Sequence, residues 1–339
     1  MFVGHGLVAF AVVAAVGRRA DWPRERVVAL AALAFAFATL PDVDVVYALG
    51  GLASGVTGPF AAANAFWATS TLVHRTVTHS LVVGTVAALG FAGWHAAGGP
   101  SSARRRTVAR GLVLSAFALL VALGAVVTSP LAAAILALFS LVGLALTSFA
   151  GHRLSWLGPR AVAGTALLGL LTHPFGDLLT GEPPAVFYPL DVALLTDRLT
   201  LHPDPTLHLL GAFGIELLAV WLGAAAFLRL RDQRLRPHVS PRAAVGIGYA
   251  GAAVALPAPT LDVSYHFVFS ILAVGTLGPI ELRRLGRSAG FEGETSPKGR
   301  SGAWTPAALG IADRTTALVT ALAAVTVAAV GYTGAYLLL

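Results

Sequence analysis

Residues 130–150 read PLAAAILALFSLVGLALTSFA and contain no charged side chain. A helix needs about 20 consecutive apolar residues to cross the hydrocarbon core of a bilayer, and this stretch has that length. Of the 339 residues, 56% are hydrophobic and only 12% are charged, about half the charged share of a soluble domain. The sequence therefore predicts an all-α, polytopic transmembrane helical bundle in the cell membrane. It argues against a soluble enzyme, a disordered chain and a nucleic-acid-binding module.

Similar apolar stretches recur along the chain, and we expect about ten of them to span the membrane. They cover residues 2–17, 27–41, 77–96, 108–127, 130–150, 160–176, 206–228, 242–257, 264–282 and 315–337. All of the 23 Lys and Arg residues except Arg75 and Arg198 fall in alternate connecting segments or at the adjoining ends of the predicted spans, on one predicted side. Because basic segments stay in the cytoplasm, this asymmetry places the N-terminus outside.

The basic segments thus have a topological role, and we expect them to contact membrane lipids rather than nucleic acid. The chain contains no cysteine, so a metal site would have to use His, Asp and Glu side chains. Residues 286–304 are polar and rich in glycine and serine, which is typical of a flexible linker.

Short polar clusters interrupt the apolar stretches, and four of them fall at the same predicted outer face. They are His5; Asp42 and Asp44; His74, Arg75 and His79; and His173 and Asp177, followed by Thr180 and Glu182. Histidines and carboxylates gathered at one membrane depth are typical ligands of a divalent metal ion. Any one of them could instead be a packing histidine, a wet loop, a helix cap or a structural pair. Chance would, however, scatter such residues over both faces.

The spacing within the clusters predicts how these side chains are presented. His173 and Asp177 lie four residues apart and so share one helix face. The proline before Asp42 disfavours a helix there, so Asp42 and Asp44 are expected on an extended segment. His79 is expected in the first turn of a helix that a preceding threonine caps.

A further polar pair, His208 and Glu216, lies inside a predicted span. A carboxylate within the membrane is costly unless it is neutral or paired. We therefore expect Glu216 to be protonated or to have a structural partner.

The order of these motifs resembles a known family. The elements are His5, Leu40-Pro41-Asp42-Val43-Asp44, His74-Arg75-x-x-Thr78-His79-Ser80 and His173-x-x-x-Asp177-x-x-Thr180. They are similar to motifs of the LexA-binding, inner-membrane-associated metal-dependent hydrolases, over roughly residues 1–190. The resemblance implies a membrane-bound metal-dependent hydrolase. We do not infer LexA binding from it. Val45 stands where some members have a further histidine, and the apolar stretches after residue 200 extend beyond a compact member.

The motifs and the resemblance together predict a membrane-embedded hydrolase core at 1–200 and a C-terminal transmembrane extension at 201–339. One or two divalent ions (zinc, manganese or magnesium) would be held at the outer membrane–water interface. The expected ligands are His5, Asp42, Asp44, His79, His173 and Asp177.

The expected reaction is hydrolysis of an ester or phosphoester. Asp44 or Glu182 would act as the general base, and His74 as a ligand or proton donor. Arg75 would hold an anionic group of a membrane-proximal substrate. Two other functions stay open: an ion or metal transporter, whose polar residues should continue toward mid-membrane, and a non-catalytic scaffold with a structural metal site.

Overall fold

The computed structural model describes residues 2–53, 56–70, 75–100, 102–178, 183–261, 263–279 and 314–339. Within these ranges every regular element is a helix, which confirms the predicted all-α class. The chain divides into two compact units, Met1–Asp232 and Gln233–Leu339. The linker predicted at 286–304 lies outside the described residues, and the functional division at residue 200 stays a prediction.

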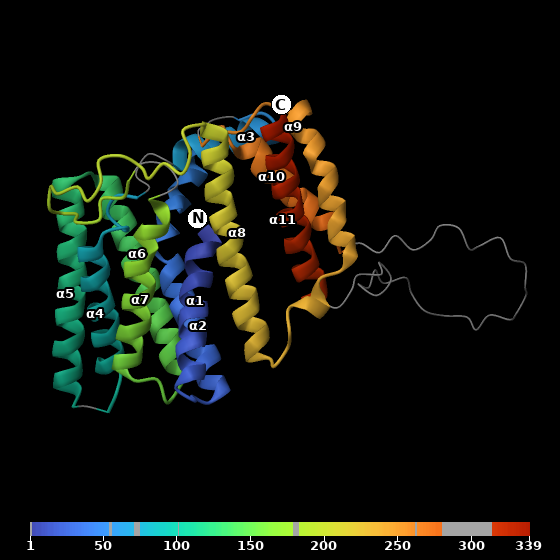
Figure 1. Ribbon diagram of the computed structural model, residues 1–339. Coiled ribbons are helices and arrows are strands. Elements are labelled where there is room, and N and C mark those ends of the chain that lie inside the picture. The colour runs from blue at the N-terminus through green and yellow to red at the C-terminus, as the bar shows by residue number, and fades with distance from the viewer. Residues whose placement is uncertain are drawn as a thin grey trace, which may run out of the picture. The chain divides into compact units, whose positions relative to one another are not determined.

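The first unit is a helical bundle (Figure 1). Its elements are α1 (Phe2–Arg19), α2 (Arg24–Thr39), the 3₁₀ helix η1 (Pro41–Ala53), α3 (Pro59–Ser70), α4 (Leu81–Ala97), α5 (Ala103–Val127), α6 (Pro130–Arg153), α7 (Pro159–Asp177) and α8 (Pro205–Leu230). The second unit contains η2 (Arg236–His238), η3 (Pro241–Gly251), α9 (Ala252–Ala255), α10 (Tyr265–Leu277) and α11 (Arg314–Leu338). In this unit α11 packs against η3 and α10.

Several helices of the first unit begin at side-chain caps that the sequence supplies. Ser80 accepts hydrogen bonds from the backbone N–H groups at the start of α4. Ser129 and Asp204 cap α6 and α8 in the same way, and a proline follows each of them as the first helical residue. Such caps satisfy backbone donors that a helix end leaves free, so they define where each helix starts.

Close packing joins α2 to its neighbours on both sides. α2 contacts α1 and α7, and α7 contacts α4 (Figure 1). Phe37 of α2 stacks on Phe91 of α4, with ring centroids 5.5 Å apart, and both rings are fully buried. Where α7 meets α2, a Cβ atom on Gly169 would lie 2.6 Å from the backbone nitrogen of Ala38. The backbones of α2 and α7 are therefore in direct contact, which only glycine permits here.

The lengths and hydropathies of the described helices do not support the prediction of about ten spans. Four of them are long and apolar enough to cross a membrane, namely α5, α6, α8 and α11. The pair α2 and η1, bent by 48°, makes a fifth if it forms one span.

Two of the other predicted spans form helices that are short for a crossing. α4 has 17 residues and α10 has 13, whereas a perpendicular crossing needs about 20. The stretch 242–257 forms most of η3 and the four-residue α9 instead of one long α-helix. Much of the apolar character of α4 serves packing, because side chains such as Val83 and Phe91 are fully buried within the bundle.

Candidate metal centre

Five of the predicted ligands converge within the first unit, each at or next to the end of a helix. His5 lies in the first turns of α1, and Asp42 lies at the start of η1, just beyond the end of α2. His79 lies just before α4, and His173 and Asp177 lie one turn apart at the end of α7. Because α2 packs on α1 and α7, and α7 on α4, these chain segments bring the five side chains together.

Two groups of three residues could each hold a metal ion. The first is His5, His173 and Asp177, and the second is Asp42, His79 and His173. Within each group, one ligand atom from each residue lies within 4.8 Å of the others. His173 belongs to both groups, so the arrangement is compatible with one ion or with two adjacent ions.

The tightest part of the site consists of two imidazoles and two carboxylates. Nε2 of His79 lies 3.0 Å from Nε2 of His173. Oδ2 of Asp177 lies 3.2 Å from the first nitrogen and 3.5 Å from the second, and Oδ1 of Asp42 lies 3.8 Å and 3.5 Å from them. Ligand atoms about 2.0–2.2 Å from a zinc ion lie about 3.3–3.6 Å apart in tetrahedral geometry. The separations in this site therefore fit a small cation between the four atoms.

Hydrogen bonds on the far sides of the two rings define which nitrogen faces the site. Nδ1 of His173 lies 2.7 Å from the carbonyl oxygen of Ala38, so this nitrogen carries the proton and donates it. The Thr78 hydroxyl donates to Oδ2 of Asp44 (3.2 Å) and lies 3.0 Å from Nδ1 of His79, which donates to it. Both Nε2 atoms are then unprotonated and present their lone pairs to the site. Metal-binding histidines adopt this tautomer when an acceptor outside the site accepts the proton of the other ring nitrogen in a hydrogen bond.

Burial lowers the pKa of His79 below its usual value, although the carboxylate of Asp177 opposes this effect. The ring is completely buried, and transfer of a charged imidazolium from water into such a site is costly. His79 is therefore a neutral imidazole near pH 7, as a metal ligand must be.

His5 and Arg75 contact the second oxygen of Asp177. Nε2 of His5 lies 3.3 Å from Oδ1 of Asp177, and the His5 ring stacks at a tilt on His173 with centroids 4.0 Å apart. Nη2 of Arg75 lies 3.6 Å from the same Oδ1, and its Nη1 donates to the backbone oxygen of Asp177. Arg75 has a φ of 69°, an uncommon conformation for a residue other than glycine, and its carbonyl accepts from the N–H of Ala185 (3.0 Å).

Several details differ from the sequence-based expectations. Asp42 and Asp44 lie on a 3₁₀ helix rather than an extended segment. His79 precedes its helix instead of lying in the first turn, and Ser80 rather than a threonine is the cap. Asp44 lies behind His79 and touches the Nδ1 side of that ring (3.5 Å) rather than the Nε2 side. His74, Thr180 and Glu182 lie outside the described residues.

Glu216 has a structural partner, as expected, but the partner is not His208. Oε1 of Glu216 accepts a hydrogen bond of 2.9 Å from the backbone N–H of Gly4, at the start of α1. Nδ1 of His208 accepts from the backbone N–H of Leu201. The contact attaches α8 to the residue that precedes His5.

Two contributors to the site were missed by the sequence reasoning. Thr78 relays a hydrogen bond from His79 to Asp44, and the carbonyl of Ala38 orients His173. The threonine could have been found from its position directly before His79. The backbone carbonyl could not, because it depends on the packing of α7 against α2.

The sequence profile of the YdjM inner membrane protein family matches residues 1–236, which include the whole candidate centre. No curated protein and no solved structure matches the chain.

Proposed function

The chain belongs to the YdjM inner membrane protein family, and from this premise we propose that it is a membrane-embedded, metal-dependent hydrolase. The proposed ligands are His5, Asp42, His79, His173 and Asp177. The substrate class is an ester or phosphoester at the membrane–water interface.

The observation that carries the proposal is the 3.0 Å approach of Nε2 of His79 to Nε2 of His173. We assign a lone pair to each of these nitrogens from the hydrogen-bond partners of the two Nδ1 atoms. Two carboxylate oxygens lie beside these nitrogens. Four acceptor atoms so close together repel one another unless a cation lies between them. In addition, Oδ2 of Asp42 is buried without a hydrogen-bond partner among the described residues, and such groups are rare unless an ion or water satisfies them.

The charge balance also favours a divalent ion. Asp42, Asp44 and Asp177 supply three negative charges around the centre, and Arg75 supplies one positive charge. With all histidines neutral, two negative charges are left in a largely buried site. Burial lowers the pKa of His173, but Asp42 and Asp177 outweigh burial and raise it overall, which reflects the same excess of negative charge. Uncompensated buried charge is strongly unfavourable, and one divalent cation would balance it.

A divalent ion held by these residues would supply Lewis acidity, which would activate water and polarise the scissile bond. In the reaction, the oxygen of water bonds to the carbonyl carbon or phosphorus. The bond to the leaving oxygen breaks, and that oxygen takes up the proton that the water loses. His79 and His173 are held in the ligating tautomer by Asp44, through Thr78, and by the carbonyl of Ala38.

Arg75 and Asp44 take more specific roles in this proposal than the motifs alone suggest. The guanidinium of Arg75 compensates Asp177, and its side chain is 14% exposed, so it can also contact an anionic substrate group. Asp44 is almost completely buried behind His79, so we assign it to orienting that ligand. Glu182 is then the proposed general base, and His74 the proposed proton donor.

We further propose that the centre faces the outside of the membrane. In the first unit, most arginines lie at helix ends away from the candidate ligands, and Arg75 is an exception. These arginines include Arg18 and Arg19 at the end of α1, Arg24 and Arg26 at the start of α2, Arg104 to Arg106 in α5, Arg153 in α6 and Arg160 in α7. The positive-inside rule places these ends in the cytoplasm and the N-terminus outside.

Turnover of purified protein in the presence of zinc, manganese or magnesium tests the hydrolase assignment. We expect the wild type to hydrolyse a member of a panel of ester and phosphoester substrates, and Asp177→Asn to lose this activity while it stays folded. The control, Asp191→Asn, removes an exposed carboxylate outside the site and should retain turnover. Metal binding without turnover would favour the scaffold, and metal flux into vesicles would favour the transporter.

A further inference from the structure

In the part of the chain that the structure describes, the ligand side chains of the candidate centre differ in exposure, and Asp42 is the most exposed. The side chains of His79 and His173 are 0% exposed, that of Asp177 is 1% exposed and that of His5 is 3% exposed. The Asp42 side chain is 13% exposed. Among the five proposed ligands, Asp42 is therefore the one that a substrate can approach from outside the bundle.

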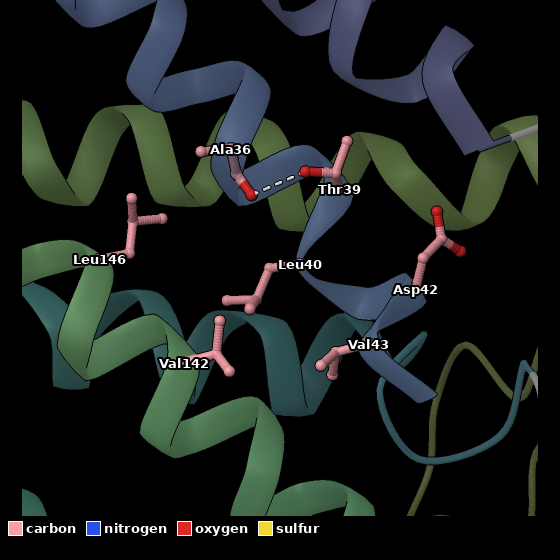
Figure 2. A pocket seen from close by; sticks show the side chains of 7 residues that line it. All are labelled: Ala36, Thr39, Leu40, Asp42, Val43, Val142 and Leu146. Carbon is pink, nitrogen blue, oxygen red and sulfur yellow. Dashed lines mark hydrogen bonds between the residues drawn. The ribbon is translucent and has the colours of Figure 1, made fainter. Parts of the chain in front are cut away.

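Asp42 lies at the edge of an apolar groove between α2 and α6 (Figure 2). The groove has a volume of about 350 Å³ and is lined by Ala36, Thr39, Leu40, Asp42, Val43, Val142 and Leu146. This volume lies within the range of about 300–1,000 Å³ that small-molecule sites occupy. Such sites combine a mostly apolar wall with a few polar groups that orient the ligand, as here.

The wall of the groove is more apolar than the residue types that line it suggest. The hydroxyl of Thr39 donates back to the carbonyl oxygen of Ala36 (3.1 Å), as Figure 2 shows, and to that of Phe35 (3.3 Å) in the same helix. Its hydrogen is thus used within α2, and its methyl group is left as the apolar part of the side chain. Asp42 is then the one charged group of the lining residues. A hydrocarbon chain fits such a wall, whereas a polar chain would lose its hydrogen bonds to water there.

We propose that this groove receives the hydrocarbon chain of an amphiphilic phosphoester and delivers its phosphate group to the centre on the Asp42 side. The inference rests on the proposed metal-dependent hydrolase, because Asp42 without a cation would repel a phosphate. Arg75, the partly exposed cation of the centre, suits an anionic head group better than a neutral ester.

The groove determines where the substrate lies more than how tightly the protein binds it. Lipid tails are as apolar as the groove wall, so a chain gains little when it moves from the bilayer into the groove. What the groove adds is position: a chain that lies along Leu146, Val142 and Val43 ends at Asp42 (Figure 2). This arrangement selects substrates that reach the centre laterally from the bilayer.

Photolabelling in phosphatidylcholine nanodiscs tests the groove with the full-length protein. The probe is a long-chain alkyl phosphate that carries a diazirine in mid-chain, and metal content is measured on the same samples. We expect labelling of α2 and α6 residues at the groove that saturates and is displaced by unlabelled dodecyl phosphate. Ala36→Phe fills the groove and should lower this labelling about tenfold.

The same substitution outside the groove controls for the added volume of the phenylalanine side chain. Ala145 lies on α6, is exposed and does not line the groove, so Ala145→Phe should change labelling by less than about twofold. Val142→Phe repeats the groove test at a more exposed position, in case Ala36→Phe does not fold. The proposal that the groove binds the hydrocarbon chain would be overturned if labelling does not saturate, or if both groove variants leave it unchanged on metal-loaded protein. The proposed function would not be affected by either result. A folded protein that holds no metal would overturn the proposed function and the groove with it.

Discussion

The Nε2 atoms of His79 and His173 lie 3.0 Å apart, although 94 residues separate them in sequence. Each ring is fixed from behind, His79 through Thr78 and Asp44, and His173 by the carbonyl of Ala38. Carboxylate and carbonyl partners of this kind commonly lie outside metal-binding histidines. The pair therefore links the packing of α7 on α2 and α4 to the chemistry of the site.

The contact of Gly169 with α2 predicts a coupled loss of stability and metal affinity. In Gly169→Ala, the new Cβ would lie 2.6 Å from the nitrogen of Ala38 and 2.8 Å from the carbonyl carbon of Phe37. Backbone cannot move aside cheaply, so we expect a destabilisation of about 1–3 kcal/mol. The displaced helix should also weaken the His173–Ala38 hydrogen bond. Thermal unfolding and metal titration measure the two effects.

Gly164→Ala is the matched control on the same helix, because nothing lies within 4 Å of its Cβ position. Alanine favours a helix over glycine by about 0.5–1 kcal/mol, so this variant should be as stable as the wild type or slightly more stable. Equal stability of the two variants would contradict the close approach of α7 to α2.

The hydrogen bonds that join Asp44 to His79 through Thr78 predict that metal affinity can be lowered without removing a ligand. Asp44→Asn keeps the shape of the side chain but removes the negative charge behind the imidazole. Loss of an outer partner of a ligating histidine typically weakens metal binding about 10–100-fold. Isothermal titration of the metal-free protein with zinc should show this decrease. An unchanged dissociation constant would mean that Asp44 does not act through His79.

The bond from Gly4 to Glu216 predicts that α8 positions His5. Glu216→Leu removes the acceptor and leaves a buried backbone N–H unsatisfied, at a cost of about 1–3 kcal/mol. Because Gly4 precedes His5, the variant should also bind metal more weakly. Glu216→Gln retains an acceptor oxygen and should behave like the wild type in both assays. If the leucine and glutamine variants are equally stable, the hydrogen bond does not position α1.

The distribution of arginine predicts the sidedness of the first unit. The wild type contains no cysteine, so single cysteines can be introduced at Ala103, at the basic end, and at exposed Asp191. A membrane-impermeant maleimide added to intact cells should label position 191 and not position 103. The reverse pattern would refute both the outward N-terminus and the outward centre.

The candidate ligands could be predicted from the sequence because each lies where a helix begins or ends. Counting apolar stretches and arginines places His5, Asp42, His79, His173 and Asp177 on one side, without knowledge of which helices touch. Helix contacts then bring them within ligand distance. Their roles as ligands stay a prediction.

The number of spans could not be predicted in this way. A stretch such as 77–96 has the hydropathy of a span, yet α4 has only 17 residues and its side chains Val83 and Phe91 are buried in the bundle. Hydropathy measures transfer from water and does not distinguish lipid from protein as the new surroundings. The role of the Ala38 carbonyl could not be predicted either, because every residue has a backbone carbonyl and the sequence does not show which one accepts a hydrogen bond.

Metal content of the purified protein tests the central claim most directly. Elemental analysis of the wild type, after incubation with zinc, manganese and magnesium salts and removal of unbound metal, should find about one or two divalent ions per chain. Asp177→Asn, with the same helical content, should retain far less. A folded, monodisperse wild type that holds no divalent ion would contradict the account, because the four acceptor atoms around His79 and His173 would then need another source of positive charge.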